Sequence, residues 1–189
     1  LRKISYLFSG DIANISGWKD EDKEGNTYKE YFSCADRYWI TNYSGYRGVQ
    51  NNENEFFLDL TENLPIELNR KFDVCFNHTT LEHIFDFRKA FNNICKMSKD
   101  IVIIVVPFAQ VQHESESYND YWRFTPSSIR KLFSENFLTT IYESWNNDFN
   151  SATYIFMVGS RFPKKWKDKM PSCNLETPAG NWIGMNTHE

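Results

Sequence analysis

Four histidines are the side chains of this 189-residue sequence best suited to move a proton near neutral pH, at positions 78, 83, 113 and 188. His113 is the first candidate for a general base because it lies in a polar segment after an apolar run. His78 is the second candidate. The alternative for both is an ordinary loop or packing histidine. We expect Glu82 and His83 to serve helix capping and packing, and we discount the terminal His188.

The segment YNDYWRFTP, residues 118–126, adds an acid and a base to a group of aromatic rings. Two interpretations of Asp120 stay open. Its carboxylate either orients a catalytic base or binds a substrate hydroxyl, or it pairs with Arg123 and holds the loop shut.

The rings of this segment suit a sugar ligand, because aromatic faces stack on the apolar faces of pyranose rings. We therefore expect a sugar substrate to contact the side chains of Tyr118, Tyr121, Trp122 and Arg123. The alternative is that Trp122 and Phe124 fill the core beneath the loop, and for Phe124 we expect the core.

Nothing in the sequence predicts a metal site. The cysteines, at positions 34, 75, 95 and 173, lack the spacing of a zinc site. The acidic run KDEDKEG, residues 19–25, lacks the oxygen spacing and the glycine position of a calcium loop. Because no Cys-x-x-Cys pair is present, we expect reduced thiols in a cytoplasmic protein.

Charge and hydropathy narrow the range of partners. A net charge of −4 does not favour binding to nucleic acid. No apolar run approaches the roughly 18 residues that a membrane span needs. The basic segment RFPKKWKDK, residues 161–169, is either a solvated tail or a site for an anionic partner. The sequence begins at Leu1 rather than at a methionine, so we expect a piece of a larger multidomain protein.

The elements that must position these residues alternate along the chain. The run DIVIIVVPF, residues 100–108, is rich in β-branched residues and predicts a central parallel strand covered on both faces. The spacing of apolar residues over 81–97 predicts one helix. Further strands are expected over 12–15, 37–43, 55–60 and 72–76.

The second half of the sequence predicts a helix and a hairpin. Thr125 is a good cap for a helix that begins with Pro126, and Asn136 is a plausible left-handed stop. Two strands with a turn at 146–150 then predict an antiparallel hairpin, over 137–145 and 152–160. The fold class is therefore α/β, a Rossmann-like, mostly parallel sheet flanked by helices that ends in this hairpin. We expect one domain over 1–160 and an irregular tail over 161–189.

The chemistry-bearing residues follow the predicted parallel strands. Because ligands of such sheets bind outside the carboxyl ends of the strands, these residues are expected to surround one crevice. They are Ser16, Gly17, Trp18, Asn42, Asp59, Asn77, His78, His113 and the 118–125 segment.

Four stretches in this order resemble the class I S-adenosylmethionine-dependent methyltransferases, in particular the type 11-like branch found among polysaccharide-building enzymes. The stretches are FFLDLTENLP, FDVCFNHTTLEHIFDFRKAFNNICKM, IVIIVVPF and HESESYNDYWRFTPSSIRKLF. The resemblance implies S-adenosylmethionine as the cofactor, and a cofactor site formed by Ser16, Gly17, Trp18, Asn42, Asp59, Leu60, Asn77 and His78. It also places His78 near the transferred methyl group.

Two positions depart from the pattern of that family. The first strand is followed by IANISGW, in which Gly17 is the one glycine of a turn that is usually glycine-rich. The usual acidic residue at the end of the second strand is replaced by Asn42, which can bind a hydroxyl without the strength of a charge.

The function expected from these residues is O-methylation of a sugar or glycan hydroxyl, or of another small molecule, with His113, His78 and Asp120 in the catalytic roles. The alternative is a degenerate, non-catalytic methyltransferase-like module of a larger protein, supported by the reduced glycine turn. A nicotinamide-dependent oxidoreductase is less well supported, because the Gly-x-Gly-x-x-Gly fingerprint is absent.

Overall fold

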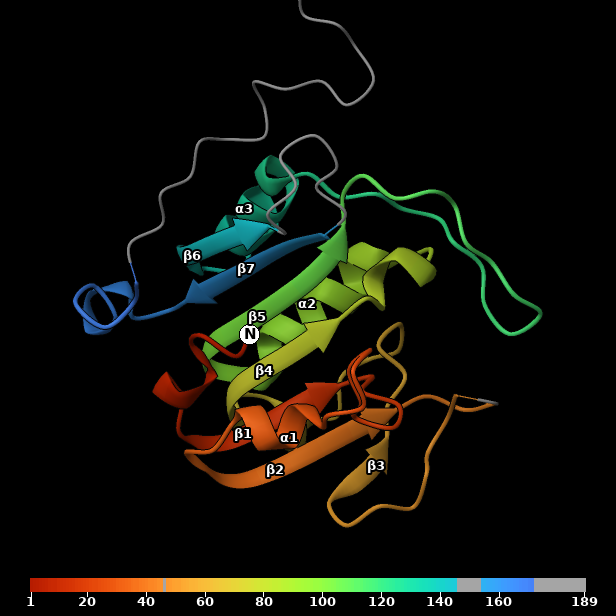
Figure 1. Cartoon of the computed structure of the whole chain (residues 1–189), viewed down its shortest axis with the longest axis horizontal. Helices are drawn as coiled ribbons and strands as arrows, with labels where there is room; N and C mark the ends of the chain where they lie inside the picture. The colour runs from red at the N-terminus through yellow and green to blue at the C-terminus, as the bar shows by residue number, and fades with distance from the viewer. Residues whose placement is uncertain (46, 146–153, 172–189) are drawn as a thin grey trace, which may run out of the picture.

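The computed structural model describes residues 1–45, 47–145 and 154–171, and in them a single seven-stranded sheet (Figure 1). The strands are β1 (Gly10–Ile15), β2 (Ala35–Asn42), β3 (Glu55–Phe57), β4 (Phe72–His78), β5 (Ser98–Pro107), β6 (Thr139–Trp145) and β7 (Tyr154–Ser160). Their order is β3-β2-β1-β4-β5-β7-β6. The first five strands pair in parallel, and β7 is antiparallel to both β5 and β6. The predicted fold class is confirmed.

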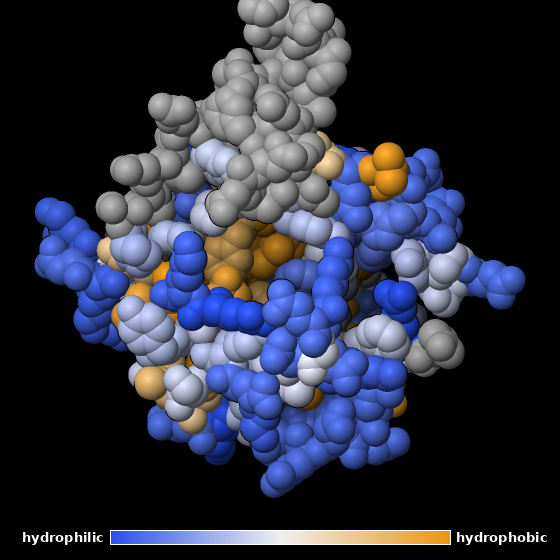
Figure 2. Space-filling model, in the orientation of Figure 1, coloured by the Kyte–Doolittle hydropathy of each residue, from blue (hydrophilic) through white to orange (hydrophobic). Residues whose placement is uncertain are grey.

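The β-branched run forms β5, and it is covered on both faces as expected. On one face lie the helices α2 (Phe87–Met97) and α3 (Pro126–Glu135), which lie behind the sheet in Figure 1. On the other face lie the 3-10 turn Ser5–Leu7 and the short helix α1 (Tyr28–Tyr31). Figure 2 shows apolar surface in the middle of this second face, surrounded by hydrophilic side chains.

The single helix predicted over 81–97 is wrong at its start. Leu81–His83 forms a separate 3-10 turn, and α2 begins at Phe87 with Asp86 as its N-cap. The Asp86 carboxylate accepts a hydrogen bond from the Lys89 backbone N–H at 3.3 Å. His83 therefore does not cap α2, and the 3-10 turn instead carries Glu82 and His83 at the edge of the sheet.

The start of α3 is confirmed, whereas its predicted end is wrong in detail. Thr125 Oγ1 accepts from the Ser128 N–H at 3.2 Å, and Ser128 Oγ accepts from the Thr125 N–H at 3.1 Å, which forms a capping box. Asn136 has φ −101° rather than a left-handed conformation, which Phe137 adopts at φ 59°. The Asn136 amide instead donates to the Leu132 carbonyl at 2.9 Å.

The segment after β7 contains a short turn and a buried tryptophan. It begins with the 3-10 turn Pro163–Lys165, and the Trp166 ring that follows is 5% exposed. The Trp166 indole N–H donates to Asp100 Oδ2 at 2.9 Å, and its ring lies 5.3 Å from that of Phe8. The predicted turn at 146–150 and most of the predicted tail lie outside the described residues.

No helix in the described part of the chain is long and apolar enough to cross a membrane.

Candidate active site

Loops that follow four parallel strands meet at the carboxyl edge of the sheet, which lies to the right in Figure 1. The Arg47 guanidinium, from the β2–β3 loop, lies 4.8 Å from the centre of the Trp18 ring and 4.6 Å from that of Tyr118. The His83 ring lies 4.6 Å from the Tyr118 ring and 5.1 Å from the His113 ring. The turn after β1 is thereby linked to the loops after β2, β4 and β5.

The turn after β1 keeps its tight shape although only one of its residues is glycine. A Cβ on Gly17 would lie 2.5 Å from Asn14 Nδ2, so a larger residue does not fit there. Ser16 and Trp18 both take left-handed conformations, at φ 58° and 48°. This conformation costs a non-glycine residue about 1–2 kcal/mol, so the rest of the turn must stabilise it. The Ser16 N–H donates to Thr41 Oγ1 at 3.1 Å.

Asn42 fixes this turn to the neighbouring strands. Its Oδ1 accepts from the Trp18 backbone N–H at 2.6 Å, and its Nδ2 donates to the Trp18 carbonyl at 3.1 Å and to Glu55 Oε1 at 2.6 Å. Both amide hydrogens are therefore used within the protein. This positioning role was not foreseen from the sequence, and a direct cofactor contact by Asn42 stays a prediction.

Three other residues expected at the cofactor site, Leu60, Asp59 and Asn77, differ in their burial and hydrogen bonds. Leu60 is buried in the core, and a contact of its side chain with a cofactor stays a prediction. Asp59 Oδ1 accepts from both the N–H and the hydroxyl of Thr61, at 2.8 and 2.7 Å. Asn77 is fully buried, and its Nδ2 donates to the Ile15 carbonyl at 2.8 Å. Its Oδ1 has no hydrogen-bond partner among the described residues.

His78 and His113 belong to different ring clusters. The His78 ring lies 5.5 Å from that of Tyr28 and 6.2 Å from that of Tyr154, and its Nδ1 is 2.8 Å from Thr79 Oγ1. Burial, followed by the positive charge of Lys23, lowers the pKa of His78 to about 4. His78 is thus neutral near pH 7 and a weak base.

Asp120 makes both of the contacts that the sequence left open. The Arg123 guanidinium donates to its two oxygens at 2.6 Å each, and these bonds chiefly lower the pKa of Asp120 to about 2. Its Oδ2 also accepts from the His113 backbone N–H at 2.7 Å and lies 3.2 Å from His113 Nδ1. The carboxylate therefore stays charged, closes the loop and lies beside the ring of the candidate base.

The residues expected to contact an acceptor divide into two groups. The Trp122 indole N–H donates to the Ile84 carbonyl at 3.1 Å, and Arg123 also donates to the carbonyls of Gln110 and Val111. These two side chains hold the loop in place. Tyr121 is exposed and Tyr118 is partly exposed, so both remain available to an acceptor. Phe124 packs in the core, as expected.

Sequence reasoning missed two features of this edge. Arg47 lies in a polar loop where no pattern marks it. Glu82 was expected to be structural, yet it is fully buried and neither carboxylate oxygen has a hydrogen-bond partner among the described residues. Burial, in the first place, raises the pKa of Glu82 to about 8.

A surface hollow lies away from this edge, at the amino ends of the parallel strands. Its lining comes mainly from the segment after β7, and it consists of Ile141, Pro163, Lys164, Trp166, Lys167, Met170 and Pro171. It shares no residue with the loops that meet at the carboxyl edge.

No protein-family model and no curated protein matches this sequence. Solved structures do match its fold. An S-adenosylmethionine-dependent methyltransferase from Clostridium acetobutylicum is 13% identical, with a TM-score of 0.58 over 82% of this chain and 85% of the other. One from Mesorhizobium loti is 8% identical, with a TM-score of 0.56 over 80% and 90%.

A third similar structure was solved with ligands. It is the 1,6-didemethyltoxoflavin-N1-methyltransferase of Burkholderia thailandensis with bound 1,6-didemethyltoxoflavin and S-adenosylhomocysteine. It is 13% identical, with a TM-score of 0.55 over 79% of this chain and 70% of the other. Together with the strand order, these likenesses show that the chain has the fold of the class I S-adenosylmethionine-dependent methyltransferases.

Proposed function

We propose that the chain is an S-adenosylmethionine-dependent O-methyltransferase. The observation that carries this proposal is the meeting of four loops at the carboxyl edge of a methyltransferase sheet, where candidate binding and proton-accepting side chains gather. Ligands of open α/β sheets bind at this edge. The fold alone does not establish an activity, so the proposal depends on these side chains.

The residues at the edge fit a nucleoside cofactor. The turn at Ser16, Gly17 and Trp18 is kept tight even at the cost of left-handed non-glycine residues, as close approach of backbone to a ligand requires. Asn77 Oδ1 is a buried acceptor that has no described partner and can bind a ligand donor. When bound, S-adenosylmethionine supplies an electrophilic methyl group. The residues proposed to hold it are Ser16, Gly17, Trp18, Asn42, Asp59, Leu60, Asn77 and His78.

His113 is proposed to take the proton from the hydroxyl group that receives the methyl group. Its ring is partly exposed and borders Tyr118, while Asp120 lies on its other side. The Asp120 carboxylate lies 3.2 Å from His113 Nδ1, so a charged group borders the ring proposed to accept the proton. General-base assistance of this kind contributes about 10²–10⁴-fold in rate.

The acceptor is proposed to be a sugar or glycan hydroxyl, as in the branch of methyltransferases found among polysaccharide-building enzymes. The support is the pair of accessible rings at Tyr118 and Tyr121. We further propose that the chain is part of a larger protein and acts in the cytoplasm. The free thiols of Cys75 and Cys95 suit a reducing compartment.

A methyl-transfer assay tests the proposed acceptor. The full chain is incubated with methyl-labelled S-adenosylmethionine and a panel of sugars, glycosides, amines and small phenols. We expect label in the sugars, and a higher KM for them in the variants Tyr118→Ala and Tyr121→Ala. Label confined to amines or to carbon atoms would contradict an O-methyltransferase.

One observation favours a second candidate, a non-catalytic binding module. Ser16 and Trp18 occupy left-handed positions that glycine takes at little cost, and Asn42 uses both amide hydrogens within the protein. A module of this kind would bind an acceptor glycan without transferring a methyl group. It predicts sugar binding that is independent of S-adenosylhomocysteine, and no label transfer to any acceptor.

A further inference from the structure

Glu82 is the most unusual buried group of the described chain. Its side chain is 0% exposed, and neither Oε1 nor Oε2 has a hydrogen-bond partner among the described residues. A buried carboxylate without a partner is costly, so such groups are normally paired or coordinate a metal ion.

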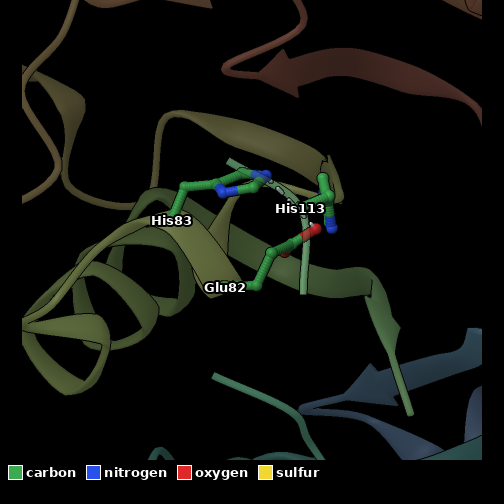
Figure 3. A group of neighbouring side chains, drawn as sticks. All are labelled: Glu82, His83 and His113. Atoms are coloured by element: carbon green, nitrogen blue, oxygen red, sulfur yellow. Dashed lines mark ion pairs between the residues drawn. The ribbon is translucent and has the colours of Figure 1, made fainter. Parts of the chain in front are cut away.

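Two histidines lie against this carboxylate, as Figure 3 shows. One ligand atom from each of Glu82, His83 and His113 lies within 4.8 Å of the others. His83 Nε2 is 3.8 Å from Glu82 Oε1. Glu82 and His83 come from the 3-10 turn after β4, whereas His113 comes from the loop after β5, so the two segments meet at this point.

The second ring nitrogen of His83 has a neighbour that suits a metal ligand. His83 Nδ1 lies 2.6 Å from the Asn119 carbonyl oxygen, which requires Nδ1 to donate and leaves Nε2 with a free lone pair. His113 Nδ1 lies 3.2 Å from Asp120 Oδ2 but makes no hydrogen bond among the described residues. Metal-binding histidines usually donate their second nitrogen to a carbonyl or a carboxylate, as His83 does.

We propose that Glu82, His83 and His113 bind one divalent transition-metal ion, with zinc as the best match. Two imidazoles and one carboxylate form a ligand set of zinc enzymes, and three protein ligands leave a position open. Calcium and magnesium prefer oxygen ligands alone, so the two imidazoles disfavour them. Zinc bonds of about 2.0–2.2 Å require the three ligand atoms to move closer together, by rotation of side chains on a turn and a loop.

In the described part of the chain, the charged groups around the cluster are Asp120, Arg123 and Arg47, and Arg47, which lies 4.6 Å from the Tyr118 ring beside His83, is the one that opposes a cation. The Arg123 charge is neutralised by its two hydrogen bonds to Asp120. Burial raises the pKa of Glu82 to about 8, so an ion that binds near neutral pH must displace a proton from this carboxyl group, which has no hydrogen-bond partner among the described residues. An ion at this point would supply the partner that Glu82 lacks.

Metal binding does not depend on the proposed methyl transfer, and it changes how His113 would act. With an ion bound, His113 is a ligand, and its loss lowers turnover because the ion is lost. Without an ion, His113 is the proton acceptor itself. A titration that measures metal binding alone distinguishes these two roles.

The test uses the full chain, free of any affinity tag and treated with a chelator, in a Cys34→Ser background that removes an exposed thiol. Cobalt(II) is added near neutral pH, its visible absorption is recorded, and zinc is then used to displace it. We expect one cobalt ion per chain, with the absorption of a low-coordinate site, and complete displacement by zinc.

Substitutions then locate the ion. His113→Ala and Glu82→Gln are each expected to weaken cobalt binding by about 100-fold or more, since loss of a ligand costs at least as much as loss of its outer-shell partner. His78→Ala, which removes an imidazole outside the cluster, is the matched control and should leave the affinity unchanged. Melting curves for every variant show that each is folded. Unchanged affinity in a folded His113→Ala, or no binding to the parent chain, would overturn the proposal.

Discussion

At the scale of a single side chain, Asp120 makes three contacts at the carboxyl edge of the sheet. Its carboxylate is held by Arg123, accepts from the His113 backbone and lies beside the His113 ring. Because the arginine keeps it ionised, the loop presents a fixed negative charge next to a histidine. Histidine is a side chain that can act either as a general base or as a metal ligand.

Replacing His113 by alanine is expected to lower turnover by about tenfold or more while S-adenosylhomocysteine binds as before, because we propose that the ring accepts a proton from the methyl acceptor and does not contact the cofactor. Steady-state rates and a binding titration on the same preparation measure the two effects. His83→Ala serves as the comparison, since it should match His113→Ala only where a metal ion is involved. Full activity in His113→Ala would remove this residue from the chemistry.

Gly17→Ala is expected to destabilise the chain by about 1–3 kcal/mol, because the new methyl group would lie 2.5 Å from Asn14 Nδ2. Ser16→Gly is the matched control and should be neutral or stabilising, since it relieves a left-handed serine at φ 58°. Urea denaturation measures both. Equal destabilisation by the two substitutions would show that the turn is not built as described.

At the scale of elements, the sequence predicts those helices and strands whose positions depend on residues close together in the chain. The β5 strand follows from a β-branched run, and the start of α3 follows from a threonine at the cap and a proline in the first turn. The break between Leu81–His83 and α2 was missed because apolar spacing continues through it, although Asp86 is a capping residue. The cluster at Glu82 was missed for another reason. Whether a carboxylate finds a partner depends on segments distant in sequence.

His78, at the end of β4, makes stability depend on pH. Its pKa is lowered to about 4 in the folded chain from an ordinary value of about 6.5, so the unfolded chain binds the extra proton first. Stability contributed by His78 is therefore complete above pH 6.5 and is lost as the pH falls toward 4. The loss between pH 6.5 and pH 5 is about 2 kcal/mol at most, and less where solvent reaches the ring.

His78→Gln should lack this part of the acid sensitivity. Urea denaturation of the two proteins at pH 7 and pH 5 gives the comparison. The wild type should lose more stability than the variant on acidification. An equal loss in both would mean that the His78 ring is not shielded from water in the way its surroundings indicate.

At the scale of the whole molecule, the two faces of the sheet are covered differently. Two regular helices cover one face, whereas turns, α1 and Trp166 cover parts of the other, where apolar surface is visible (Figure 2). Trp166 lies beyond residue 160, where the sequence predicts that the domain ends, and its ring is buried against the rest of the chain. The boundary at residue 160 stays a prediction.

Trp166→Ala is therefore expected to destabilise the chain by about 3–5 kcal/mol, as for a buried aromatic residue of the core. Trp166→Phe should cost less, because it keeps a ring against Phe8 and loses mainly the hydrogen bond to Asp100. Denaturant titrations of both variants provide the measurement. A neutral effect of Trp166→Ala would support a domain that ends at residue 160.

The central claim is that the loops leaving the parallel strands form a cofactor site around the turn at Gly17. Calorimetric titration with S-adenosylhomocysteine tests this claim most directly, with the wild type, Ser16→Gly and Gly17→Ala compared at a temperature where all three are folded. We predict saturable binding of one ligand per chain to the wild type and to Ser16→Gly, and a large loss of affinity in Gly17→Ala. No detectable binding to the wild type at millimolar ligand would contradict the claim.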